Sequence, residues 1–200
     1  MDQTSPSGVN VTRRDTEQAH IIIGGPGMDR RDERRWAFEL LNHVMGSGMS
    51  SRLFREVREE RGLAYAIYAF RLAYADNGAW GVYVGTTPSQ TETAVNLIRA
   101  ELAKVVAEGI TVEELERAKG SMRGGLALSL EDANSRMVRL GRDELSGMPH
   151  LSVDERLEKL EAIDLDDVHS VAKDMYGAGS RLIGAVGPFD EGELDGYLGV

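Results

Sequence analysis

Residues 40–70 read LLNHVMGSGMSSRLFREVREERGLAYAIYAF. The first part of this stretch completes a helix with apolar residues at helical spacing, and Gly46 and Gly48 predict its end. A second helix is expected to begin at the serine pair 50–51 and to end at Gly62, because serine favours helix starts and glycine favours helix ends. The aromatic residues that follow indicate a strand. The stretch therefore predicts helix, glycine turn, helix and strand.

The clearest strand pattern comes next. The segments YAIYAFRLAY (65–74) and AWGVYVGT (79–86) flank Asp76-Asn77-Gly78, which predicts a hairpin with Asn-Gly as its positive-φ turn residues. Further strands are expected at AHIIIG (19–24) and RLIGAV (181–186). The intervening region is helical, with Asp164 as one expected helix cap and three candidate capping boxes: Ser89 with Glu92, Thr111 with Glu114, and Ser152 with Glu155.

The order of these elements predicts the fold class. Helical segments follow one another without intervening strands, which excludes a repeated βαβ unit and favours an α+β domain. We expect a mostly antiparallel sheet with helices packed on one face. Residues 1–16 are polar and are interpreted as a frayed leader or linker, and residues 17–200 are predicted to form one domain.

Composition excludes several function classes. The chain of 200 residues has a formal net charge of −10 and no cysteine. The negative charge disfavours nucleic-acid binding, and the missing cysteine excludes disulfides and Cys-ligated zinc and fits a reducing compartment. The polar start has no signal-peptide character, and no apolar run reaches the length of a membrane helix. These features predict a cytoplasmic protein that binds neither nucleic acid nor membrane.

The usual catalytic motifs are missing from the sequence. None of the four histidines (His20, His43, His150 and His169) stands in H-E-x-x-H or H-x-x-E-H. We therefore interpret them as structural residues and predict neither a metal site nor a bound cofactor in this chain. The glycine turn at 46–51 lacks the Gly-Lys-Ser/Thr ending of a phosphate loop. A capped turn between helices explains it better, although a helix N-terminus can hold an anion.

Arg58 and Tyr65 are the candidate site residues. Arg58 lies near the end of the second helix and Tyr65 begins the next strand, seven positions later. A turn through Gly62 is expected to bring both side chains to one edge of the sheet. From the residues alone, an ion-paired arginine and an interfacial tyrosine remain the simpler interpretation.

The stretch from Leu40 to Phe70 resembles the second-domain signature of the pitrilysin-type, or inverted-zincin, metallopeptidases, a family that includes the mitochondrial processing peptidase. EQAHIIIGGPG (17–27) and the later helices and strand follow the same order, so the resemblance covers roughly residues 18–188. The glycine turn reads Gly-Ser-Gly where Gly-Gly-Gly is usual in the family. The resemblance implies one half of a clamshell of two homologous domains, of which the other carries H-x-x-E-H and zinc.

Members of this family cleave peptides, so the resemblance implies a role in peptide cleavage. It implies that Arg58 and Tyr65 hold the peptide and polarise the scissile carbonyl, while zinc belongs to a partner domain that this chain lacks. We expect the chain to be a fragment, to be inactive alone, and to bind a peptide substrate and the zinc-bearing domain, with self-association. The alternative is a non-catalytic structural or assembly domain, because the same fold serves in respiratory-complex core subunits.

Overall fold

The computed structural model describes residues 8–177 and 181–197. Five strands form one sheet in the order β1-β5-β2-β4-β3. Their bounds are β1 Gly8–Arg13, β2 Ala19–Gly27, β3 Ala66–Ala73, β4 Gly78–Thr86 and β5 Leu182–Gly187. Every neighbouring pair is antiparallel except β1 with β5, which confirms the predicted mostly antiparallel sheet.

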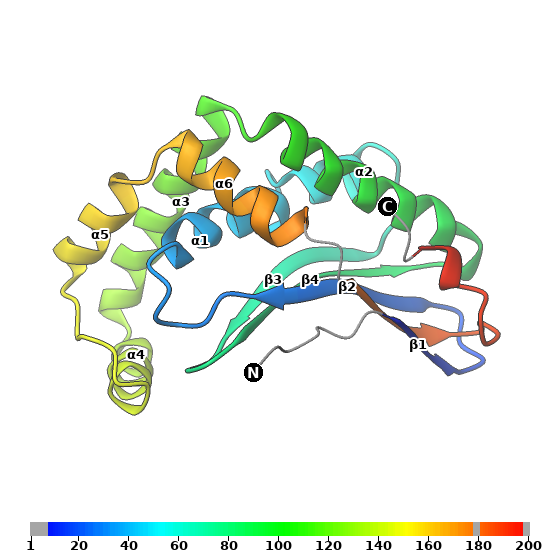
Figure 1. Cartoon of the computed structure of the whole chain (residues 1–200), viewed down its shortest axis with the longest axis horizontal. Helices are drawn as coiled ribbons and strands as arrows, with labels where there is room; N and C mark the ends of the chain where they lie inside the picture. The colour runs from blue at the N-terminus through cyan, green and yellow to red at the C-terminus, as the bar shows by residue number, and fades with distance from the viewer. Residues whose placement is uncertain (1–7, 178–180, 198–200) are drawn as a thin grey trace.

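The helices lie on one side of the sheet (Figure 1), as predicted for this α+β class. Helices α1 (Arg35–Gly46), α2 (Thr91–Glu108) and α6 (Leu165–Tyr176) pack against β3, β4 and β2, respectively. Helix α3 (Val112–Glu131) packs on α1, and α4 (Ala133–Leu145) and α5 (Val153–Glu161) pack on α3. The remaining turns are η1 (Phe54–Glu59), η2 (Pro88–Gln90) and η3 (Asp195–Tyr197).

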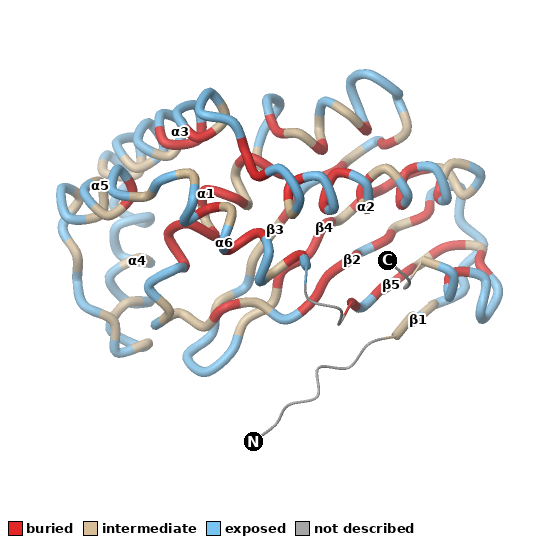
Figure 2. The backbone as a smooth tube through the Cα atoms, turned by 45° about the horizontal axis from the view of Figure 1, so that its top comes forward, coloured by how far each residue is buried: buried red, intermediate tan, exposed pale blue. Residues whose placement is uncertain are grey.

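The core lies between the sheet and the helices α1, α2 and α6. Alternation along the strands buries one set of side chains under the helices, for example Ile21, Ile23 and Val82. Figure 2 shows this burial along β2, β4 and α1, whereas α4 has no buried residue. The structure thus has a well-packed two-layer centre and a more exposed helical extension formed by the end of α3 and by α4.

The face of the sheet away from the helices is partly apolar. Ile22, Tyr68, Leu72 and Leu182 alternate with the buried strand residues, and each is more than 40% exposed. Tyr68 stacks on Tyr83, with ring centroids 4.8 Å apart. A contiguous apolar patch of this kind is typical of an interaction surface.

The expected frayed leader needs a correction. Residues 8–13 are paired as edge strand β1, in register from Gly8 with Leu182 to Arg13 with Gly187. Val9 and Val11 pack against the hydrophobic core. The polar composition hid this strand, because only these two alternating valines contribute to the core. Residues 1–7 of the expected leader lie outside the described residues.

The hairpin is confirmed, but its turn chemistry differs from the prediction. Neither Asn77 nor Gly78 has positive φ. Gly78 instead allows a close approach of two backbones, since a Cβ there would overlap the carbonyl oxygen of Met28. The glycine is therefore required by packing against the segment after β2, and not by the turn itself.

The expected helix caps are confirmed in part. The capping boxes at Thr111–Glu114 and Ser152–Glu155 are formed, and Asp164 caps α6. The third candidate is wrong: α2 begins at Thr91, and its N-cap Gln90 makes no side-chain hydrogen bond. Among the described residues, the Ser51 hydroxyl accepts no backbone N–H of the second helix and instead donates to the Gly48 carbonyl, 2.8 Å away.

Candidate functional site

Arg58 lies on a π-helical turn. The segment Phe54–Glu59 follows an i→i−5 pattern, in which the Glu60 N–H donates to the Arg55 carbonyl at 2.8 Å. Such turns are rare and are often found at functional sites. The Arg58 side chain is exposed, and its guanidinium carbon lies 5.0 Å from the centroid of the Phe54 ring. Among the described residues, no carboxylate forms an ion pair with Arg58.

Gly62 reverses the chain after this helix. Its φ is +62°, a conformation that strains residues with a Cβ. The amides of Gly62 and Leu63 donate to the carbonyls of Arg58 and Val57, at 3.2 and 2.9 Å. These bonds close the helix and direct the chain into β3, so the predicted end of the helix at Gly62 is confirmed.

Tyr65 lies immediately before β3, which is an edge strand. Its backbone N–H donates to the Gly85 carbonyl at 2.8 Å, and the neighbouring Ala64 is buried. The Tyr65 side chain is 56% exposed, and its hydroxyl has no hydrogen-bond partner in the part of the chain that the structure describes. A rigid backbone thus presents a phenol to solvent at the start of β3.

The structure places Arg58 and Tyr65 on the same connection, between η1 and β3, and η1 packs against β3. Across the described ranges, no hydrogen bond joins the two side chains to each other. Both retain free donors: the guanidinium has several N–H groups and the phenol has one O–H. The arrangement can present hydrogen-bond donors to a ligand at this end of the sheet edge.

A half-buried ion pair fixes the helix that carries Arg58. Arg52 donates from Nε and Nη2 to the two carboxylate oxygens of Glu114, at 2.6 and 2.7 Å, and from Nη2 to the Gly109 carbonyl at 3.1 Å. Both side chains are at most 15% exposed. Glu114 is also the capping-box residue of α3, accepting from the Thr111 N–H at 2.8 Å. One carboxylate therefore ties the start of the second helix to the start of α3.

The sequence prediction gave Glu114 a place in a capping box and assigned no partner to Arg52, so it missed this pair. Burial acts to raise the pKa of the Glu114 carboxyl, but the hydrogen bonds from Arg52 and from the Thr111 amide, with the Arg52 charge, lower the pKa below its ordinary value. The capping-box signal gave Glu114 a local role, and nothing in the local pattern indicated its long-range partner.

We expect Glu114→Gln to destabilise the fold by about 2–3 kcal/mol at neutral pH, somewhat less than the loss of a fully buried ion pair. Glutamine can still complete a capping box through its one oxygen, so the change removes the charge and one acceptor of Arg52 while it keeps the cap. The melting temperature should fall by about 5–10 °C. Because the folded-state pKa is lowered, the contribution is present above the ordinary glutamate pKa and is lost as the pH falls through the lowered value.

The measurement is thermal unfolding of both proteins from neutral to acidic pH. The difference between them should be constant near neutrality and should shrink below about pH 4.5. Glu116→Gln removes an exposed carboxylate from the same helix and serves as the control. Equal melting temperatures for the variant at Glu114 and this control would show that the ion pair contributes nothing.

The histidines make structural contacts. The hydroxyl of Tyr83 lies 2.8 Å from Nδ1 of His20, and the Val106 carbonyl lies 2.9 Å from Nε2 of His169. His150 pairs with Glu144 at 2.8 Å, and burial lowers the pKa of the half-buried His43. Over residues 8–177 and 181–197, no three His, Cys, Asp or Glu side chains form a group that fits a metal ion.

Within the described part of the chain, no helix combines the length and the apolar character that crossing a membrane requires.

The glycine turn at 46–51 connects α1 to the second helix, and Met49 in this turn is 78% exposed.

Comparison with known proteins identifies the family. A family model described as the peptidase M16 inactive domain matches residues 1–122. The chain belongs to this family. An uncharacterized zinc protease of Streptomyces coelicolor is 45% identical over 183 residues, which are 92% of this chain and 40% of that protein. One from Bacillus subtilis is 40% identical over 82% of this chain and 40% of its own length. The chain thus spans about two fifths of these M16 relatives.

Solved structures share the fold. A peptidase M16 inactive-domain structure from Pseudomonas fluorescens has a TM-score of 0.84 at 23% identity, covering 94% of this chain and 45% of that one. A chain of Complex III from Candida albicans has a TM-score of 0.82 at 19% identity, covering 98% of this chain and 50% of that one. The family membership that residues 40–70 predict for this chain is confirmed by the family model.

Proposed function

We propose that this M16 domain is the substrate-binding, metal-free half of a zinc-dependent endopeptidase. It acts with an H-x-x-E-H domain that binds the zinc ion, and it contributes Arg58 and Tyr65 to the bound peptide. The observation that carries this proposal is the pair itself, exposed on a π-helical turn and at the start of an edge strand, with donor groups that no described residue uses.

The donor groups of this chain support the assignment of zinc to the partner domain and of peptide binding to this chain. The described residues contain no cluster that fits a metal ion, whereas the relatives are named zinc proteases and are longer than this chain. Zinc, when bound in the partner domain, supplies Lewis-acid chemistry. This chain supplies binding and orientation. Its own groups are hydrogen-bond donors, which suit the carbonyl oxygens of a peptide.

A structural or assembly role is the alternative, and the likeness to a chain of Complex III is one of fold alone. A scaffold has no need of an exposed arginine and tyrosine with unused donors beside a sheet edge. The fold is common to both roles, so the side chains at positions 58 and 65 favour the peptidase component.

We expect the purified chain to bind no stoichiometric zinc and to cleave no peptide. We also expect it to associate with itself or with the zinc-bearing domain. The contact would form through exposed apolar surface such as that of Ile22 and Tyr68. Metal analysis, a peptide-cleavage assay and sedimentation with and without that domain are the measurements. About one tightly bound zinc ion per chain, together with peptide cleavage that a chelator abolishes, would overturn the proposal that only the partner domain binds zinc. A chain that stays monomeric and does not bind the partner domain would contradict the clamshell pairing of two homologous domains.

A further inference from the structure

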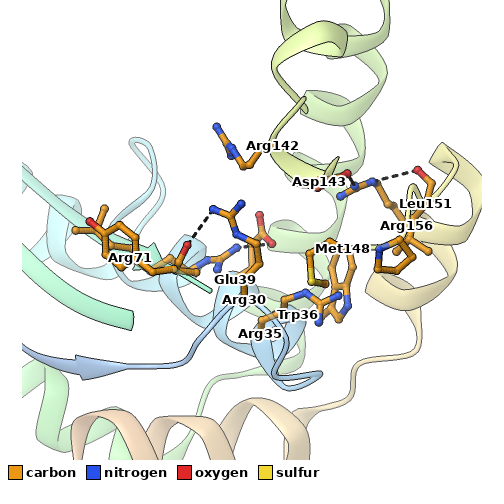
Figure 3. A pocket seen from close by; sticks show the side chains of 14 residues that line it. Arg30, Arg35, Trp36, Glu39, Arg71, Arg142, Asp143, Met148, Leu151 and Arg156 are labelled. Carbon is orange, nitrogen blue, oxygen red and sulfur yellow. Dashed lines mark hydrogen bonds and ion pairs between the residues drawn. The ribbon is translucent and has the colours of Figure 1, made fainter. Parts of the chain in front are cut away.

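An arginine-rich pocket lies at the other end of β3 from Tyr65 (Figure 3). Its volume is about 510 Å³, and residues of α1, α4, α5 and the last part of β3 line it. Five of the lining residues are arginines and only two are carboxylates: Arg30, Arg35, Arg71, Arg142 and Arg156, with Glu39 and Asp143. This excess of positive charge contrasts with the net charge of −10 for the whole chain.

Three of the arginines have carboxylate partners. Arg71 pairs with Glu39 at 2.7 Å, and Arg156 pairs with Asp143 at 2.6 Å. Arg35 reaches the exposed Glu33 at 3.4 Å. Both acidic side chains of the lining are thus already engaged, and they leave the two other arginines without a counter-charge from the pocket wall.

Arg30 is held in place by neutral groups. Its Nη1 donates to the Ser146 hydroxyl at 2.5 Å, and its Nη2 donates to the Ala73 carbonyl at 2.9 Å. The same hydroxyl donates to the Arg142 carbonyl at 2.5 Å, so Ser146 can only accept from Arg30. These contacts fix the half-buried guanidinium between β3 and α4. They do not neutralise its charge, and a partly desolvated charge without an opposite charge is costly.

Arg142 forms no hydrogen bond or ion pair through its side chain within the described ranges. Figure 3 shows this side chain leaving α4 at the pocket, with no interaction drawn to it. Its guanidinium therefore keeps its donors for a ligand. A guanidinium presents donors in a planar fork, which matches carboxylate and phosphate oxygens.

We propose that this pocket binds a small ligand with two or more oxyanion groups, carboxylate or phosphate, held by Arg30 and Arg142. Arg30 is the preorganised contact, and the exposed Arg142 supplies donors that no described residue uses. Apolar parts of the ligand can lie against Trp36, Met148 and Leu151, which complete the wall. The eight residues of β3 separate this pocket from the start of the strand by about 24 Å, and the inference does not depend on the proposed peptidase role.

The test measures binding of citrate and of pyrophosphate to the chain by calorimetric titration and by thermal unfolding. Sodium chloride at the same ionic strength is the control. Saturable binding and a rise in melting temperature are expected with citrate, pyrophosphate or both, but not with sodium chloride. Binding of citrate alone assigns the pocket to carboxylates, and binding of pyrophosphate alone assigns it to phosphates. Failure of both oxyanions to bind would overturn the proposal.

Arg142→Gln should weaken binding at least tenfold without loss of stability, because the wild-type side chain makes no contact that folding uses. Arg139→Gln removes the same charge from the same helix at a position outside the pocket lining, and should change the affinity less than threefold. Arg30→Lys keeps the charge and loses the fork, so its affinity should fall while binding persists. Equal weakening by Arg139→Gln and Arg142→Gln would show diffuse attraction and contradict a built site.

Discussion

Tyr65→Phe is expected to lower kcat by about 10²–10³-fold in a preparation where this domain acts with the zinc-bearing domain. When water attacks a peptide carbonyl, negative charge develops on the carbonyl oxygen. The Tyr65 hydroxyl can donate a hydrogen bond to that oxygen, because no described residue occupies it and the side chain is 56% exposed. Donors aimed at a developing oxyanion lower the activation barrier by about 3–4 kcal/mol.

Phenylalanine keeps the ring and removes the donor, so the fold should be unchanged. The measurements are kcat, KM and bound zinc, with the melting temperature as a check on folding. Because the bond is made in the transition state, kcat should fall while KM changes little. Tyr74→Phe is the matched control: it removes a hydroxyl from another exposed tyrosine, which follows the far end of β3 and is 55% exposed. Wild-type turnover by Tyr65→Phe with zinc bound would exclude this role.

The course of the chain from α1 through the hairpin follows from local signals. Glycine after a run of helical apolar residues ends α1, Gly62 closes the second helix, and alternation of aromatic and small residues gives β3 and β4. Edge strand β1 does not follow from such signals, because it lies outside the dense core and contributes only Val9 and Val11 to packing. Its polar residues resemble a linker until β5 is present to pair with it.

Long-range pairing set the other limit to prediction. Arg52 and Glu114 are 62 positions apart, and each has a complete local explanation as a polar helix residue or a capping residue. The arginines of the pocket come from positions 30 to 156, and no sequence spacing relates them. By contrast, Arg58 and Tyr65 are close in sequence and lie on one connection between η1 and β3, so their proximity along the chain could be predicted, whereas their shared role at the sheet edge stays a prediction.

The π-helical turn gives the placement of Arg58 a physical basis that the sequence did not reveal. The sequence predicts an ordinary helix from the serine pair 50–51 to Gly62, but the wider turn at Phe54–Glu59 changes the direction of each side chain along it. The Arg52–Glu114 pair holds the start of this segment and Gly62 closes its end. Arg58 thus projects from a segment that is fixed on both sides, which suits a residue that must orient a ligand.

Arg58→Ala is accordingly expected to lower kcat/KM by about 10²-fold in the same two-domain preparation, with zinc content unchanged. The guanidinium would hold a backbone carbonyl of the bound peptide and fix its register, and misplacement of a substrate by about 1 Å can cost this much. Arg58→Lys keeps one charged donor but loses the fork, so it should recover only part of the loss.

The competing explanation is a structural role through the Phe54 ring. That contact, at 5.0 Å, is a cation–π interaction at an exposed site and contributes about 0.5–1 kcal/mol. Its loss would lower the melting temperature by no more than about 4 °C and would leave kcat/KM unchanged. Arg55→Ala, on the same turn with only a 3.9 Å contact to Glu60, is the control for the removal of an exposed arginine. A drop in kcat/KM for Arg58→Ala but not for Arg55→Ala assigns the loss to peptide orientation, whereas wild-type kcat/KM in Arg58→Ala leaves the residue only its contact with Phe54.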